Sequence, residues 1–271
     1  MKVVLISRLD DERVLNYTSS LARDLGDLGF EVAFETGTGA SLGMPGMDFA
    51  DFSADIAVVI GGDGSVLLTV QQMKRQIPVI GINWGEVGFL TDLEPSDALA
   101  FFTHIRDSGY QVEKRMRITL SLDGTHLGDA LNEAVIVTTR PAKMLRFTVL
   151  IDGIEVEWFR SDGILISTPT GSTAYAMSAG GPIVDPRIEG FLLVPLAPYL
   201  LSSRPHLISL DRKFEIRLES TKPAHLVLDG QQDCELATGS VLRIEKSNEA
   251  ALFIDVGTNF FTKVDSKLRR L

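Results

Sequence analysis

The segment Gly61-Gly62-Asp63-Gly64-Ser65 has the residue types of a phosphoryl-transfer site. It follows a run of mostly β-branched residues, 56–60, and precedes an apolar stretch with helical spacing. Its glycines let the backbone approach a ligand, and the free amides at the start of a helix attract phosphate oxygens. A carboxylate would repel those oxygens, so Asp63 is better suited to take a proton from an attacking hydroxyl or to bind a divalent cation. The alternative is an ordinary turn in which Asp63 or Ser65 caps the helix.

Two familiar nucleotide-binding loops are excluded by inspection, and so are thiolate and imidazole metal sites. The Walker A loop needs a Gly-Lys pair, which the chain lacks, and the dinucleotide-binding glycine pattern that starts at Gly37 fails at Leu42. The four histidines and the single cysteine, Cys234, show no ligand spacing. A metal that takes part should therefore be a hard cation such as Mg²⁺, bound by carboxylate and nucleotide phosphate oxygens.

Three polar segments stand among apolar strands in the second half of the chain. Residues 162–182 begin with a buried strand and continue with many hydroxyl side chains and glycines. Such a polar surface can bind ribose hydroxyls and a base edge, although Ser and Thr clusters also form turns and caps. Asn132-Glu133 lies in the apolar stretch 127–137, where a buried carboxylate must be paired or face a ligand unless it is at a sheet edge. Asp229-Gly230-Gln231 follows an apolar run and has the composition of a hairpin turn.

The first half of the chain alternates continuous apolar strands with amphipathic helices. Strands are expected at 3–6, 30–34, 56–60 and 78–82, and helices at 14–28, 66–73 and from 95 onward. The glycine- and methionine-rich stretch 37–51 is expected to be a flexible loop. Apolar strands separated by helices indicate a parallel sheet covered on both faces, which places Asp63 directly after a strand.

From about residue 111 the pattern changes to alternation with period two. Apolar residues alternate with polar ones in 112–122, 145–151 and 154–158, and Asp152-Gly153 between the last two is a type I′ turn sequence. This half is expected to be antiparallel β-sheet, with one face buried and the other exposed to solvent. We therefore predict an α/β domain over 1–110 and an all-β domain over 111–255, with a short helix in 260–271.

Composition excludes several classes of protein. With 271 residues the chain is long enough for two cores, and its net charge of −10 argues against binding nucleic acid through bulk charge. One cysteine rules out an intramolecular disulfide and fits a reducing compartment. Residues 191–201, the longest apolar run, are too short for a membrane helix and contain two prolines. We expect a cytoplasmic protein that binds no membrane and no nucleic acid.

In combination these segments resemble the NAD kinases. The glycine-rich segment, Gly81-Ile82-Asn83 with Gly88-Phe89-Leu90-Thr91-Asp92, Asn132-Glu133 and Thr168-Pro169-Thr170-Gly171-Ser172-Thr173-Ala174-Tyr175 occur in the family's order. The resemblance extends from Val3 to about Phe261. It implies an α/β N-terminal domain, a β-sandwich C-terminal domain, a last segment (256–271) that returns to the first domain, and phosphorylation of the adenosine ribose 2′-hydroxyl of NAD to give NADP.

The resemblance also implies roles for individual residues. The aspartate that matches Asp63 is the family's general base, and Gly64 lies beside it; Asn132 and Glu133 match a pair that lines the NAD site. Further NAD contacts are implied for Asp162, Thr173, Ala174, Tyr175, Ala176, Met177 and Ser178, and from spacing alone for Lys143, Arg160, Ala197 and Gln231.

What remains open concerns the donor, the metal and a few unusual residues. The resemblance implies ATP, another nucleoside triphosphate or polyphosphate as donor, a divalent cation such as Mg²⁺, and a homodimer or homotetramer. Thr69 stands where many relatives have arginine, and Trp84 and Glu86 depart from the family pattern. Two other functions are considered: a kinase with the same loop that acts on a lipid or sugar phosphate, and a non-catalytic NAD or NADP sensor.

Overall fold

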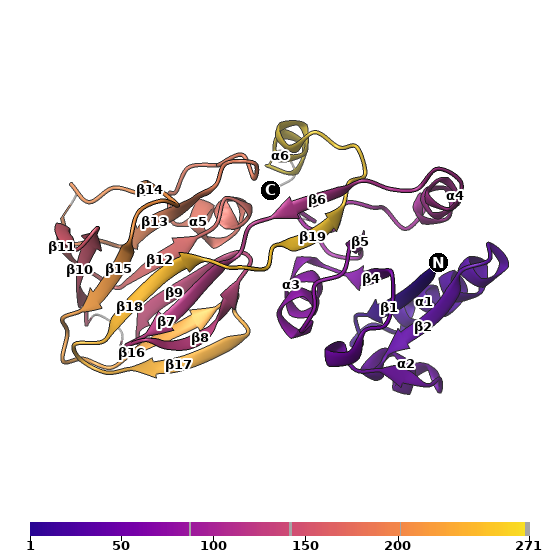
Figure 1. The fold of residues 1–271 in the computed structure, drawn as a ribbon, viewed down its shortest axis with the longest axis horizontal. Coiled ribbons are helices and arrows are strands. Elements are labelled where there is room, and N and C mark those ends of the chain that lie inside the picture. The colour runs from indigo at the N-terminus through magenta and orange to yellow at the C-terminus, as the bar shows by residue number, and fades with distance from the viewer. Residues whose placement is uncertain (87, 141–142, 201, 269–271) are drawn as a thin grey trace. The chain divides into compact units, whose positions relative to one another are not determined.

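In the computed structural model, which describes residues 1–86, 88–140, 143–200 and 202–268, the two sequence patterns occupy two separate units (Figure 1). The first unit comprises Met1–Lys114 and Ala251–Leu271, and the second comprises Arg115–Ala250. Among the described helices, none combines the length and the apolar character that crossing a membrane requires.

The first unit is built on a seven-stranded sheet with the order β3-β2-β1-β4-β5-β19-β6. β1 pairs in parallel with β2 and β4, and β5 pairs in parallel with β4 and β19. Strands β1 and β4 are buried along almost their whole length, as strands covered on both faces must be. The strand bounds are β1 Lys2–Ser7, β2 Glu31–Glu35, β3 Gly46–Met47, β4 Ile56–Gly61, β5 Val79–Asn83, β6 Val112–Arg115 and β19 Ala251–Ile254.

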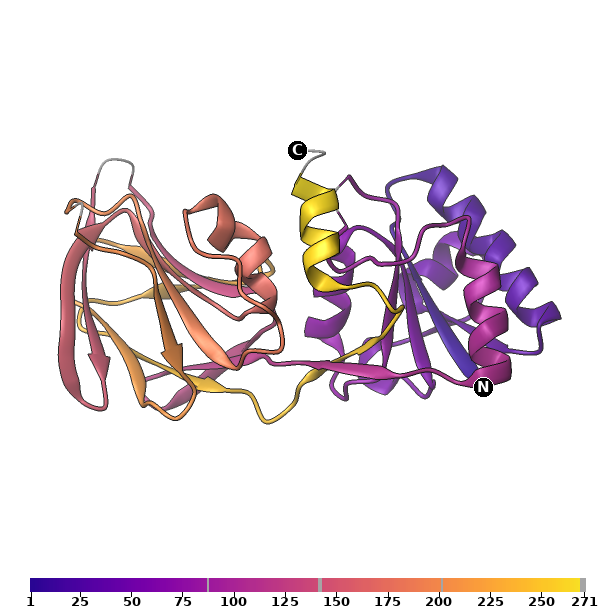
Figure 2. The same cartoon turned by 90° about the horizontal axis from the view of Figure 1, so that it is seen from above.

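Helices cover both faces of this sheet (Figure 2). The apolar sides of α1 (Glu12–Asp27) and α4 (Ala98–Ser108) share one core cluster with β1 and β4, while α3 (Asp63–Gln72) and α6 (Phe260–Leu268) lie on the other face. From β1 the sheet is extended in one direction by β2 and β3, and from β4 it is extended in the opposite direction by β5. Ligands of open α/β sheets bind at such a change of direction, outside the carboxyl ends of the strands. The glycine-rich segment lies there, at the end of β4.

One expectation for the first unit is wrong. Residues 37–51 are not a flexible loop but form α2 (Thr36–Leu42), β3 and a 3₁₀ turn, Phe49–Asp51. Glu35 caps α2, because its carboxylate accepts hydrogen bonds from the Gly37 and Thr38 amides at 2.7 and 2.9 Å. Gly39 lets the chain return closely, since a Cβ there would lie 2.8 Å from the Met44 carbonyl oxygen. Gly39 therefore permits a close backbone contact and does not indicate a mobile loop.

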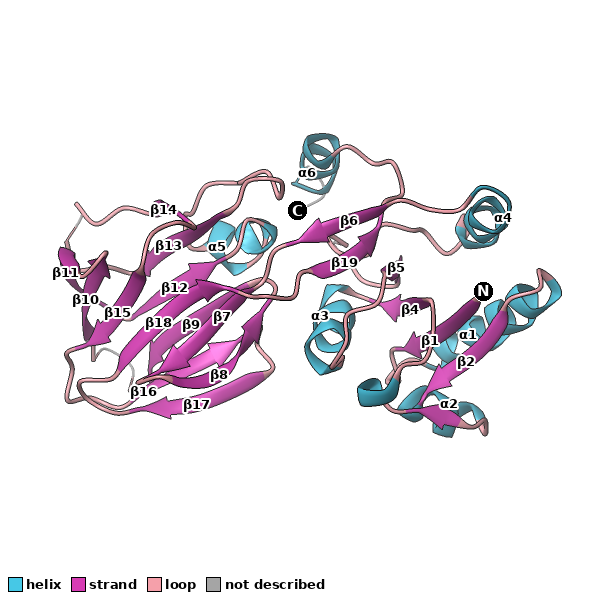
Figure 3. Ribbon diagram, in the orientation of Figure 1, coloured by secondary structure: helices cyan, strands magenta, loops and turns pink. Residues whose placement is uncertain are grey.

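The second unit is a sandwich of two antiparallel six-stranded sheets (Figure 3). Their orders are β11-β10-β15-β18-β7-β8 and β14-β13-β12-β9-β16-β17, and alternate residues of both sheets form one core. The predicted α/β and antiparallel β halves are thus confirmed. The bounds are β7 Ile118–Leu122, β8 Thr125–Ala130, β9 Glu133–Thr138, β10 Leu145–Ile151, β11 Ile154–Ser161, β12 Gly163–Ser167, β13 Gly190–Leu196, β14 His206–Ser209, β15 Phe214–Leu218, β16 Ala224–Leu228, β17 Gln232–Leu236 and β18 Val241–Lys246, with a 3₁₀ turn Thr170–Thr173 and a short helix α5 Tyr175–Ser178.

Candidate functional site

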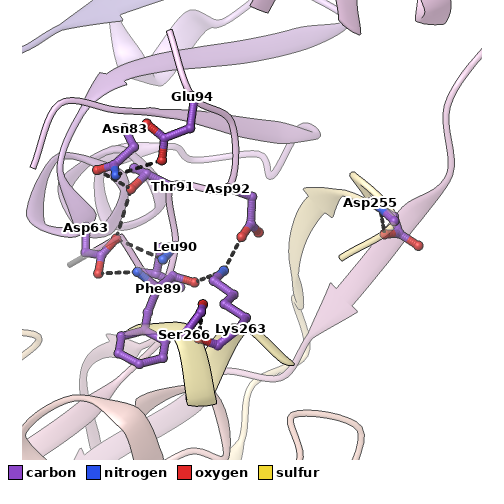
Figure 4. Close-up of polar contacts among 11 residues, drawn as sticks. Asp63, Asn83, Phe89, Leu90, Thr91, Asp92, Glu94, Asp255, Lys263 and Ser266 are labelled. Carbon is purple, nitrogen blue, oxygen red and sulfur yellow. Dashed lines mark hydrogen bonds and ion pairs between the residues drawn. The ribbon is translucent and has the colours of Figure 1, made fainter. Parts of the chain in front are cut away.

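Asp63 is the first residue of α3, and its carboxylate is bound by the backbone of a different segment (Figure 4). One oxygen, Oδ2, accepts from the Phe89 amide at 2.8 Å, and the other, Oδ1, accepts from the Leu90 amide at 2.8 Å. The N-cap of α3 is Gly62, so neither Asp63 nor Ser65 caps the helix as the alternative interpretation requires. The side chain is half-buried, and its orientation is fixed before any ligand binds.

Gly61 is a glycine for steric reasons. A Cβ at this position would lie 2.5 Å from the Ser65 hydroxyl oxygen, and its carbonyl accepts from the Trp84 amide at 2.8 Å. At Gly64, by contrast, a Cβ would meet no atom of the described residues within 4 Å, and the backbone is exposed. The segment thus combines a packed start with an open backbone at the beginning of a ten-residue helix, which is the arrangement that binds phosphate oxygens.

The segment that binds Asp63, residues 88–92, is itself held from two sides. The Thr91 hydroxyl lies 3.2 Å from the Asn83 side-chain oxygen and 3.3 Å from Oδ1 of Asp63, so it donates to one of these. Lys263, from α6, donates to the Phe89 carbonyl oxygen at 2.5 Å and forms an ion pair with Asp92. Lys263 is only 9% exposed. The sequence analysis did not identify Lys263, because an isolated lysine in an amphipathic helix carries no signal of such a contact.

In the second unit, Asp229 organises the segment that contains Asn132 and Glu133. Its carboxylate accepts hydrogen bonds from the amides of Leu131, Asn132 and Glu133 at 2.7, 2.8 and 2.9 Å. Asp229 and Gly230 have φ angles of 47° and 67°, so the hairpin turn expected from the sequence is present. The turn also presents a carboxylate that fixes the start of β9, a role that composition does not reveal.

Glu133 is a mostly buried carboxyl group with unusual acidity. Burial, and then the charge of the nearby Asp229 carboxylate, raise its pKa to about 8. Within the described residues its Oε2 atom has no hydrogen-bond partner, while the neighbouring Asn132 is 6% exposed. At neutral pH Glu133 is therefore mostly protonated, and it can donate a hydrogen bond to a ligand.

The hydroxyl-rich segment differs from the expected ligand surface. The Ser167 and Thr168 hydroxyls donate to the carbonyls of Asn132 and Leu131 at 3.0 and 2.6 Å, and Ser172 accepts from the Val184 amide at 3.0 Å. All three side chains are buried: the Ser167 and Thr168 hydroxyls bind the backbone of residues 131–132, and the Ser172 hydroxyl binds the backbone of Val184. The predicted contact residues Thr173 and Ala176 are buried as well, whereas Ala174 and Met177 are partly exposed.

A pocket of about 410 Å³ in the second unit joins four of the predicted NAD-binding residues. Asp162, Tyr175, Ser178 and Ala197 line it, and Tyr175 is 46% exposed. Ala197 has a φ of 46°, a strained conformation for a residue with a Cβ. An aromatic ring, a hydroxyl and a carboxylate in one hollow are suited to a nucleoside, since they supply stacking and hydrogen bonding together.

The remaining predicted residues lie outside this pocket. Lys143 and Gln231 are exposed, and the Arg160 guanidinium stacks over the Tyr199 ring at 4.4 Å from its centroid. Among the unusual positions, the Trp84 ring packs against the Tyr17 ring, with 5.4 Å between the ring centroids, and Glu86 is exposed. Thr69 is buried and its hydroxyl donates to the Ser65 carbonyl at 2.8 Å, so it supplies no cation to the glycine-rich segment.

Comparison with protein families gives two adjacent matches. Residues 3–110 match the ATP-NAD kinase N-terminal domain, and residues 131–256 match the ATP-NAD kinase C-terminal domain. Similar curated proteins include an NAD kinase of Methanoculleus marisnigri, 63% identical, and one of Methanoregula boonei, 62% identical. Both alignments span 271 residues and cover the whole of each chain.

Solved structures agree in fold. A crystal structure of an NAD kinase from Archaeoglobus fulgidus in complex with ATP has a TM-score of 0.82 and 31% identity, with full coverage of both chains. Yeast NADH kinase complexed with NADH has a TM-score of 0.86 over 99% of this chain and 87% of its own, at 21% identity. The second similarity shows the fold alone.

Proposed function

The chain belongs to the NAD kinase family and is an NAD kinase, and from this premise we propose that Asp63 is its general base. The observation that carries the proposal is the carboxylate at the start of α3, held by two amides beside a phosphate-binding backbone. Each carboxylate oxygen retains a lone pair that the adenosine ribose 2′-hydroxyl of NAD can approach.

The proposed reaction is a single in-line displacement. The 2′-oxygen forms a bond to the γ-phosphorus of ATP, the bond from that phosphorus to the β,γ-bridging oxygen breaks, and ADP leaves. The hydroxyl proton passes to the Asp63 carboxylate. Proton transfer to a positioned base contributes about 10²- to 10⁴-fold to such rates, and the rest comes from positioning and charge neutralisation.

ATP is the donor we propose, and backbone amides are its main ligands in this chain. The Archaeoglobus fulgidus relative was solved with ATP, which supports this choice over polyphosphate. Gly61, Gly62, Gly64 and Ser65 form the phosphate loop, in which the exposed backbone at Gly64 leaves room for oxygens. A chain of net charge −10 must bind phosphates locally in this way.

The divalent cation is proposed to arrive with the donor. Within the described ranges no group of three or more His, Cys, Asp or Glu side chains could hold a metal ion, so these residues do not form a resident metal site. Mg²⁺ commonly keeps several waters and binds substrate phosphates with few protein ligands, and we treat it as part of the ATP substrate.

NAD recognition is proposed for the second unit. The pocket of Asp162, Tyr175, Ser178 and Ala197 fits a nucleoside, and the protonated Glu133 beside Asn132 can donate to a hydroxyl. Thr173, Ala174, Ala176 and Met177 are proposed to act through their backbone or exposed edges, and Lys143, Arg160 and Gln231 stay weaker candidates. A homodimer or homotetramer in the cytoplasm also stays a prediction.

An assay of NADP formation by the Asp63→Asn variant tests the proposal. Asparagine keeps the size of the side chain but cannot accept the proton, so kcat should fall at least about a hundredfold while NAD still binds. ATP and polyphosphate are compared as donors in the same assay, with and without Mg²⁺. Turnover near the wild-type rate in Asp63→Asn would exclude Asp63 as the base.

A further inference from the structure

Lys263 and Asp63 are joined through one peptide group in the 88–92 segment (Figure 4). The carbonyl of Phe89 accepts from the Lys263 ammonium, and the amide of Leu90, which belongs to the same peptide plane, donates to Oδ1 of Asp63 at 2.8 Å. In a trans peptide these two groups point in opposite directions. A cation and an anion therefore bind the two ends of one amide dipole.

This arrangement polarises the amide toward the carboxylate. A positive charge on a carbonyl oxygen draws electron density from the N–H group, and hydrogen bonds in a chain strengthen one another where the dielectric is low. Lys263 is 9% exposed, so solvent screens its charge little, and its ion pair with Asp92 compensates the cost of burying it. The same ammonium also fixes the position of the segment on which both amide donors of Asp63 lie.

We propose that Lys263 is a positioning residue for the general base: it orients Asp63 through the Phe89–Leu90 peptide. This inference rests on the proposed role of Asp63. It assigns to the last helix, α6, a part in the reaction that the pattern of the sequence does not indicate. Lys263 itself is not proposed to contact either substrate.

Lys263→Met removes the charge and keeps much of the side-chain volume. We expect kcat to fall about ten- to a hundredfold, because small misplacement of a reacting group has effects of this size. The KM for NAD should change less than about twofold, since the NAD pocket lies in the other unit.

Two further variants separate positioning from folding. Lys263→Arg retains a cation that can donate to the Phe89 carbonyl and should recover part of the lost kcat. Lys267→Met makes the same change one turn later on α6, at a side chain for which no hydrogen bond or ion pair is found within the described residues, and should leave kcat unchanged. Rates are expressed per folded protein, from unfolding curves recorded under assay conditions.

The results also separate this inference from the proposed role of Asp63. If Lys263→Met keeps the wild-type kcat per folded protein while Asp63→Asn is inactive, the base stands and the role of Lys263 is overturned. A lower kcat with an equal rise in the KM for NAD and no recovery in Lys263→Arg would likewise reject positioning through the peptide. If Asp63→Asn is fully active, the base itself is wrong.

Discussion

Lys263 and Asp63 bind opposite ends of the peptide group between Phe89 and Leu90. The contact joins the beginning of α3 to the last helix of the chain across a segment that neither residue adjoins in sequence. Both residues, and the segment between them, belong to the first unit. The second unit has a comparable centre in Asp229, which binds three successive amides.

Gly61 and Gly64 should respond in opposite ways to alanine. Gly61→Ala places a Cβ 2.5 Å from the Ser65 hydroxyl oxygen, so we expect a loss of about 1–3 kcal/mol in the free energy of unfolding. The Cβ that Gly64→Ala adds would meet no atom of the described residues within 4 Å. This variant should keep or slightly raise the free energy of unfolding, since alanine is the better helix former. Its KM for ATP should nevertheless rise if phosphate oxygens approach the backbone there. Urea unfolding and initial rates measure both effects; equal stability losses would contradict the packing difference.

Stability should fall with rising pH through the titration of Glu133. Its folded pKa, about 8, lies above the ordinary value of 4.5, so the folded state binds the proton more tightly than the unfolded state. The contribution is fully present below pH 4.5 and is lost progressively up to about pH 8. In Glu133→Gln this component is absent, so its unfolding free energy relative to wild type should rise between pH 5 and 8. Denaturant midpoints at several pH values test this, and parallel curves for the two proteins would refute it.

Asp229→Asn should destabilise the second unit by about 1.5–3 kcal/mol. The two carboxylate oxygens accept from three amides, and the asparagine NH₂ group would face one or more of these donors instead. The KM for NAD should rise as well, because the Asn132-Glu133 segment loses its anchor. Asp233→Asn is the matched control: its side chain is 69% exposed and lies 3.4 Å from the His225 imidazole, so stability should change by less than about 0.5 kcal/mol. Equal effects of both variants would show that the anchor is unimportant.

The sequence allowed the architecture to be predicted because its cause is local. Runs of buried residues such as 56–60 and the alternation in 145–151 follow from the faces that each strand covers, and every residue of such a strand carries the signal. The position of Asp63 at the carboxyl end of β4 follows from the same pattern. The error at 37–51 came from treating glycine as a sign of mobility, whereas Gly39 permits a close backbone contact.

The contacts that fix the candidate site were not predictable in the same way. Lys263 lies 174 residues from Phe89, and Asp229 lies 97 residues from Asn132. Each of these two contacts joins a side chain to a backbone group, and backbone groups are the same for every residue type, so the atoms contacted leave no mark in the sequence. Asp92, which pairs with Lys263, is one of many acidic residues and does not by itself identify its partner. The buried hydroxyls of Ser167 and Thr168 show the converse, since residue types suited to a ligand are used to support a neighbouring strand.

The place of β19 between β5 and β6 has a consequence for synthesis of the enzyme. Residues 251–254 are made after the whole β-sandwich, yet the first sheet is continuous only when they are inserted between two strands made much earlier. A nascent chain that has not yet reached residue 251 therefore holds the glycine-rich segment in an unfinished sheet, and its Phe89 carbonyl has no ammonium partner. A chain that stops before residue 251 loses both contributions at once, the strand that joins β5 to β6 and Lys263.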